Sequence, residues 1–153
     1  MALSTEIIAD FLQNVHPYDS LDSSTREALA TQITAQEFPQ GSDIYALGDR
    51  LDALFIIHSG AVAVSDETGA PLSELAARNS FGERALMRGG IAGTSARATR
   101  DTVLLALPAA QFQSLQSQSE AVRRFFDRSR PTQAAKQSLA TRRVDSLMSA
   151  PAL

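Results

Sequence analysis

The chain has 153 residues, of which 44% are hydrophobic and 20% charged, and its formal net charge is -3 at pH 7. This length suits one domain with a short extension, and no apolar run approaches the length of about 18 residues that a membrane span requires. The absence of cysteine and the presence of only two histidines exclude a disulfide framework, a zinc finger, a thiol nucleophile and a multi-histidine metal site. We therefore expect a cytoplasmic protein that is not an enzyme and holds no metal.

Two amphipathic helices are predicted near the N-terminus. The first spans Ser4 to Val15, with Ser4 as its N-cap and apolar residues along one side. The second begins near Asp22 or Ser24, where the residues from Ser24 to Glu27 fit a capping box.

A β-rich section is predicted next. All eight glycines lie between residues 41 and 93, where they separate short apolar runs. This spacing is typical of antiparallel strands joined by tight turns. We expect a mainly β domain, an antiparallel β-roll of the double-stranded β-helix or jelly-roll type, with helices at both ends. The expected strands are residues 44–47, 54–58, 61–65, 72–76, 95–99 and 103–107. Helix is predicted to return after Pro108 and again near Glu120.

Polar residues inside this section are interpreted as structural. His58 lies in an apolar strand, and Asp49 and Asp52 flank a turn and have no evident acid-base partner. After residue 120, Lys and Arg outnumber Asp and Glu. We interpret this basic stretch as solvated helix faces or a docking surface rather than as a nucleic-acid site.

One segment carries a recognisable pattern, which begins Phe81-Gly82-Glu83-Arg84-Ala85 and continues to Ala98. Together with the glycines at 41, 48 and 60 and the helices at each end, it resembles the cyclic-nucleotide-binding domain family, with the β-roll of the cAMP receptor. The resemblance covers about residues 5 to 130, within an expected domain of residues 1–130, and implies a regulatory, ligand-sensing domain. In that family the segment is the phosphate-binding cassette, so residues 81–98 are called the cassette segment below.

The resemblance also implies roles for single residues. Glu83 matches the glutamate that accepts a hydrogen bond from the ribose 2′-hydroxyl, and Gly82 matches a glycine whose backbone approaches the ligand. A gapless match sets Ala92 on the arginine that pairs with the phosphate. The candidate ligand-binding residues are Phe81, Gly82, Glu83, Arg84, Ala85, Ala92, Gly93, Thr94 and Ser95.

The implied ligand is cAMP, cGMP or another nucleotide-like molecule. Because Ala92 lacks the usual charge, cyclic nucleotides are expected to bind weakly, unless Arg84, Arg88 or Arg97 replaces it. These three alternatives stay open. A second hypothesis is a degenerate domain that binds no ligand and serves homodimerisation or docking. The apolar contact would then be Val122, Phe125 and Phe126.

The last residues, from Arg143 to Leu153, resemble the opening of a CBS domain, although an ordinary amphipathic helix fits them as well. Combined with the cassette segment, they resemble bacterial signalling proteins in which such a domain precedes paired CBS domains and a nucleotidyltransferase region. This implies that the chain is a fragment. Residues 131–142 would be a linker, and the C-terminal helices would relay ligand occupancy to the downstream domains.

Overall fold

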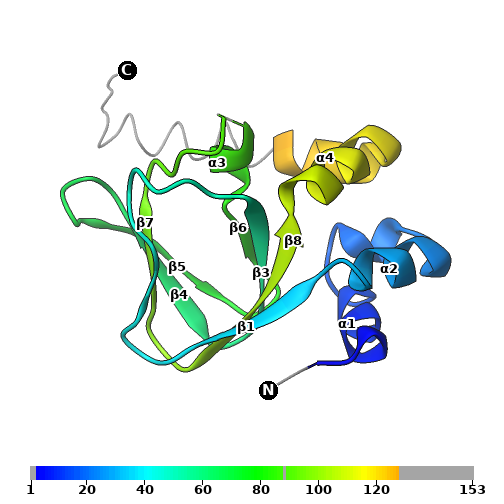
Figure 1. Cartoon of the computed structure of the whole chain (residues 1–153), viewed down its shortest axis with the longest axis horizontal. Coiled ribbons are helices and arrows are strands. Elements are labelled where there is room, and N and C mark those ends of the chain that lie inside the picture. The colour runs from blue at the N-terminus through cyan, green and yellow to red at the C-terminus, as the bar shows by residue number, and fades with distance from the viewer. Residues whose placement is uncertain (1–2, 88, 128–153) are drawn as a thin grey trace. The chain divides into compact units, whose positions relative to one another are not determined.

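The computed structural model describes residues 3–87 and 89–127 (Figure 1). The chain divides into two compact units, residues 1–118 and 119–153. The first unit holds two four-stranded antiparallel sheets that face each other, with helices beside them, which confirms the predicted roll. The expected linker at 131–142 and the CBS-like segment at 143–153 lie outside the described residues and stay predictions.

The N-terminal helical layer consists of α1 (Thr5–Leu12), the short 3-10 helix η1 (Tyr18–Ser20) and α2 (Ser23–Ala30). Ser4 caps α1 as predicted, since its Oγ accepts a hydrogen bond from the Ile7 amide at 3.2 Å. The cap of α2 is Asp22, whose Oδ1 accepts from the Thr25 amide at 2.8 Å. The predicted capping box at Ser24 is therefore wrong, because the Asp22 carboxylate, two residues earlier, already accepts the hydrogen bond from the free Thr25 amide.

Two sheets form the roll. The first has the order β1 (Thr34–Phe38), β8 (Thr102–Pro108), β3 (Ala53–Ser59), β6 (Ser80–Phe81). The second has the order β2 (Asp43–Tyr45), β7 (Ser95–Ala98), β4 (Ala61–Ser65), β5 (Pro71–Ala76). The six predicted strands are confirmed to within two residues at each end. β1 and β6 were not predicted, because β1 is mostly exposed without apolar alternation and β6 has only two residues.

The core centres on β3 and β8, which are buried on both faces. Its fully buried members include Leu54, Ile56, Ile57, Leu104, Leu105 and Leu107. One face of these strands looks toward the second sheet, and the N-terminal helices lie beside the other (Figure 1). On that side the rings of Phe11 and His58 lie 4.7 Å apart between their centroids.

The predicted C-terminal helices are also present. α4 (Ala109–Gln118) buries Phe112 and Leu115 and closes the first unit. In the second unit, residues 120–127 are helical, and the Ser119 Oγ accepts from the Val122 amide at 3.2 Å. Within the described ranges, no helix is long and apolar enough to cross a membrane.

Candidate functional site

The cassette segment begins with a sharp turn from β6 into the short helix α3 (Glu83–Met87). Gly82 makes this turn with a φ of +95°, and its carbonyl accepts a hydrogen bond from the Leu86 amide at 3.3 Å. A Cβ at Gly82 would meet its nearest neighbours at 3.6 to 3.9 Å, which is ordinary contact. The backbone conformation, rather than lack of space, therefore calls for glycine here.

The second half of the cassette segment is held by the loop between β2 and β3. The Gly90 carbonyl accepts from the Leu51 amide at 2.6 Å, and the Ala92 amide donates to the Asp49 carbonyl at 2.8 Å. The Ala92 carbonyl in turn accepts from the Gly48 amide at 2.8 Å. Three backbone hydrogen bonds thus fix the position where the family resemblance expects an arginine.

Glu83 is the one charged side chain that is buried in the part of the chain that the structure describes, with 5% of its surface exposed. Burial raises the pKa of the Glu83 carboxyl, because it outweighs the hydrogen bond from the residue's own amide and the charge of Arg84. The Glu83 charge helps to raise the pKa of two buried phenols, Tyr18 and Tyr45. The carboxylate therefore lies inside the fold, and its charge acts on both phenols.

This burial predicts a stability cost at neutral pH. Because the folded-state pKa of Glu83 is raised, the folded chain binds the carboxyl proton more readily than the unfolded chain. Stability therefore falls as pH rises from the unfolded-state pKa to the raised folded-state pKa. We expect Glu83→Gln to stabilise the protein at pH 7, with the gain shrinking as pH falls through the raised folded-state pKa and vanishing below the unfolded-state pKa. Urea unfolding at several pH values measures this. An equal effect of Glu83→Gln at all pH values would contradict it.

Tyr18 connects the N-terminal helical layer to the cassette segment. Its side chain is fully buried, and its hydroxyl lies 3.1 Å from the Ser80 Oγ in β6. Ser80 precedes Phe81 and the Gly82 turn, so η1 braces the strand from which the cassette segment begins.

The remaining candidate residues divide between the inside and the outside of the roll. Ala92 is 3% exposed, and its methyl group is buried. Thr94 is half-buried, and its side chain lowers the pKa of the Tyr45 phenol, against the larger effect of burial. The Ser95 Oγ accepts from the Leu47 amide at 3.0 Å, so it supports the neighbouring loop, and Gly93 is exposed. Glu83 and Thr94 thus both act on the pKa of Tyr45, whereas the Ser95 hydroxyl contacts the loop at Leu47.

Of the three arginines considered as replacements, Arg97 is excluded. Its Nε donates to the Asp43 Oδ1 at 3.0 Å, and both side chains are exposed. Alternation along β7 buries Ala96 and Ala98 and so directs Arg97 out of the roll. Arg84 is half-buried on α3, and Arg88 lies outside the described residues.

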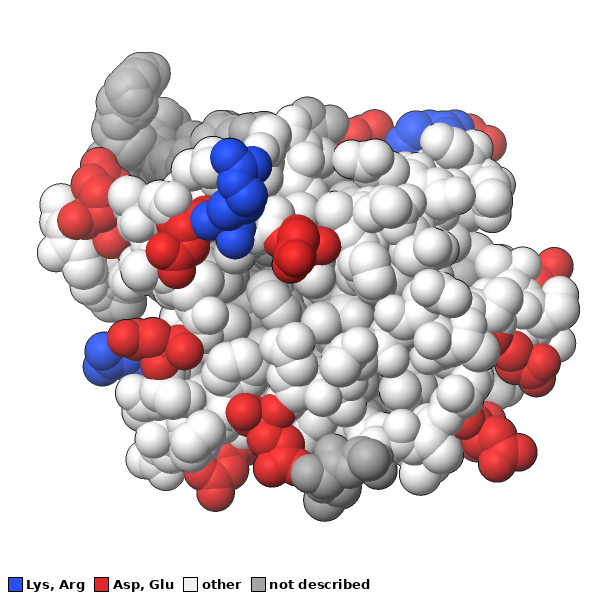
Figure 2. Space-filling view, viewed as in Figure 1, with Lys and Arg blue, Asp and Glu red and all other residues white. Residues whose placement is uncertain are grey.

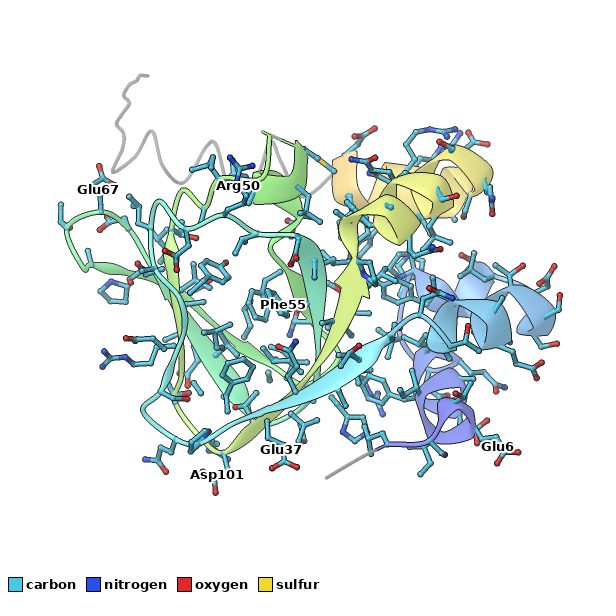
Figure 3. The ribbon with its side chains drawn as sticks, viewed as in Figure 1. Glu6, Glu37, Arg50, Phe55, Glu67 and Asp101 are labelled. Carbon is cyan, nitrogen blue, oxygen red and sulfur yellow. The ribbon has the colours of Figure 1, made fainter. Side chains whose placement is uncertain are left out.

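Arg50 is a further cationic neighbour that the sequence analysis missed. It forms an isolated antiparallel bridge with Ile91 in the cassette segment. Figure 3 places it at the end of the roll near α3. At the same place Figure 2 shows a basic side chain on the surface, with acidic side chains close by. Arg50 is exposed, so its charge faces solvent rather than the interior.

An aromatic cluster spans the two sheets beside Glu83. Phe55 and Phe81 are paired across β3 and β6, with ring centroids 5.4 Å apart. Tyr45, from β2 in the other sheet, lies 6.3 Å from Phe55 and 6.2 Å from Phe81. Figure 3 shows Phe55 between the sheets. Tyr45 was not predicted as a site residue, because a register irregularity between Asp43 and Tyr45 decides its direction.

Comparison with known proteins accords with this geometry. The family profile described as "Cyclic nucleotide-binding domain" matches residues 35–119. The chain belongs to the cyclic nucleotide-binding domain family. It is 28% identical over 134 residues to an NTE family protein of Mycobacterium tuberculosis, covering 82% of this chain and 23% of that protein. The chain thus spans about a quarter of the length of this relative.

Two solved structures have the same fold. The regulatory domain of Toxoplasma gondii PKA with cAMP has a TM-score of 0.76 at 20% identity, over 84% of this chain and 50% of that chain. The regulatory subunit of a cAMP-independent protein kinase A from Trypanosoma cruzi, bound to guanosine, has a TM-score of 0.71 at 26% identity, over 81% and 45%. Both structures come from regulatory chains of protein kinase A, and the domain described here has the same fold.

Proposed function

We propose that this domain is a ligand-sensing regulatory module in which the Glu83 carboxylate accepts a hydrogen bond from a ribose hydroxyl. The observation that carries the proposal is the burial of Glu83, with its pKa raised, at the start of the cassette segment. A buried carboxylate costs stability unless it is hydrogen-bonded, and groups kept at such a cost are typical of binding sites. A ribose hydroxyl would supply a further donor, in addition to the residue's own amide.

Cyclic nucleotides are expected to be weak ligands. Ala92 offers a buried methyl group where the family resemblance expects the phosphate-binding arginine. Arg97, the nearest alternative on β7, is paired with Asp43 outside the roll. The similar Trypanosoma cruzi subunit is cAMP-independent and was solved with guanosine, which supports a nucleoside or another nucleotide-like ligand for this fold.

The domain is proposed to regulate other parts of a longer protein and to have no catalytic activity of its own. The described residues contain no group of three or more His, Cys, Asp or Glu side chains that could hold a metal ion. Relay would pass through the helices after Pro108 to downstream domains, and a cytoplasmic location is part of the same proposal. The alternative of docking through Val122, Phe125 and Phe126 has less support, because Val122 and Phe126 are already buried.

Glu83→Gln tests the proposal directly. Calorimetric titration of the wild-type chain with guanosine and with cGMP should show binding of at least one, and the substitution should weaken it about tenfold or more. Glu74→Gln is the matched control, because Glu74 is exposed on β5 and accepts from the Thr99 hydroxyl. Equal affinity of wild type and Glu83→Gln, or no binding of any nucleoside or cyclic nucleotide, would contradict the proposal.

A further inference from the structure

We infer that Tyr18 and Arg26, both in the N-terminal helical layer, are positioning residues for the Glu83 carboxylate. Tyr18 acts through Ser80, which lies three residues before Glu83, and Arg26 acts by holding the turn that carries Tyr18. The consequence for ligand affinity rests on the proposed function, whereas the placement of Glu83 can be measured without a ligand.

The strand β6 has few contacts of its own that could fix the site. It consists of two residues at the edge of its sheet, so among the described strands it pairs with β3 alone. The Gly82 turn and Glu83 follow it directly. A shift of Ser80 would therefore be passed on to Glu83, because only Phe81 and the Gly82 turn separate the two residues.

Tyr18 gives β6 a second anchor. Its side chain is fully buried, and its hydroxyl shares a hydrogen bond of 3.1 Å with the Ser80 Oγ. Burial raises the pKa of the Tyr18 phenol, and the Glu83 charge raises it further, so the phenol stays neutral and keeps its hydrogen bond. Removing either hydroxyl would leave the other without this partner inside the fold.

Arg26 of α2 holds the turn that carries Tyr18. Its Nη1 donates to the carbonyls of Tyr18 at 3.5 Å and of Asp19 at 3.4 Å, and also to the carbonyl of Leu21. A guanidinium is a donor group of fixed geometry, so this one side chain ties three backbone acceptors of the turn to α2. A continuous series of contacts therefore runs from α2 through η1 to β6 and the Glu83 carboxylate.

Carbon NMR of the whole chain tests the placement of Glu83 without a ligand. Tyr18→Phe keeps the buried ring and removes the hydroxyl, and Ser80→Ala removes its partner. In both variants the Glu83 carboxyl should titrate at a lower pH than in the wild type, because a displaced cassette segment admits water to a carboxyl whose pKa is raised by burial. Ser80→Thr retains the hydroxyl and should titrate like the wild type. The signal is assigned with Glu83→Gln.

Amide hydrogen exchange measures the same displacement at a second point. The Leu86 amide donates to the Gly82 carbonyl at 3.3 Å, so its exchange rate reports opening of the turn. The Leu86 amide should exchange about two- to tenfold faster in Tyr18→Phe and in Ser80→Ala, a larger change than for the amides of β8, which report global unfolding. The double variant should match the single ones, since all break one hydrogen bond. Arg26→Met should change the exchange in the same direction.

Ser42→Ala is the matched control, because the Ser42 Oγ donates to the Pro39 carbonyl at 2.7 Å in the loop between β1 and β2. It should leave the Glu83 titration and the Leu86 exchange unchanged. Calorimetry then follows the effect on binding: Tyr18→Phe and Ser80→Ala should each weaken the binding of guanosine or cGMP about two- to tenfold.

The outcomes separate this inference from the proposed function. If Tyr18→Phe and Ser80→Ala lower the stability but leave the Glu83 titration and the Leu86 exchange as in the wild type, the inference is overturned and the proposed function stands. If neither guanosine nor cGMP binds the wild type, the proposed function is rejected, and the titration and the exchange still decide whether Tyr18 positions Glu83.

Discussion

Arginine in place of Ala92 is expected to tighten cAMP and cGMP binding roughly ten- to a hundredfold, the range that a charged hydrogen bond of about 1.5 to 3 kcal/mol provides. The backbone at residue 92 is held by hydrogen bonds to residues 48 and 49, so the substitution changes the side chain at a fixed position. Calorimetry measures the affinity.

Ala92→Met is the matched control, because it adds length at the same buried position without charge. It should give no gain for cyclic nucleotides. Overpacking at a residue that is 3% exposed costs about 1 to 3 kcal/mol of stability, so unfolding is measured for both variants. If folded Ala92→Arg binds cyclic nucleotides no better than wild type, then residue 92 does not occupy the arginine position, and the gapless match is wrong.

Gly60→Ala is expected to cause the largest loss of stability, about 3 kcal/mol or more. Gly60 has a φ of +99°, and a Cβ there would lie 2.4 Å from the Thr102 Oγ1 and 2.6 Å from the Asp101 carbonyl oxygen. Thr102 is buried and its hydroxyl donates to the Ala61 carbonyl, so it has little freedom to move. Urea unfolding of the variant should show a much lower midpoint.

Gly41→Ala separates the two causes. Gly41 has a similar φ of +88°, but nothing lies within 4 Å of its Cβ position, so only the backbone conformation is penalised. A loss of about 1 to 2 kcal/mol is expected for this control. If both alanine variants lose the same amount, close packing against Thr102 contributes nothing at Gly60.

Much of the architecture could be predicted from the sequence, because local chemistry determines it. The glycines between strands require turns with positive φ, and the structure has positive φ at Gly41, Gly48, Gly60 and Gly69. The Ser4 cap and the helices after Pro108 follow from similarly local signals. The cassette segment was found because Phe81, Gly82 and Glu83 are adjacent in the chain.

Tertiary structure alone decided which residues gather around Glu83. Tyr45, Phe55 and Phe81 come from three strands of two sheets, and only the packing of those sheets brings their rings together. A register irregularity in β2, invisible in the sequence, turns Tyr45 toward Ala96 and the interior.

The arginines show the same division between sequence and structure. The sequence established that residue 92 is alanine and that Arg97 lies two residues beyond Ser95. It could not show that Asp43, which is distant in the chain, pairs with Arg97 on the outer face. Nor could it show that Arg50 bridges the cassette segment, because strand partners are chosen by long-range burial rather than by local propensity.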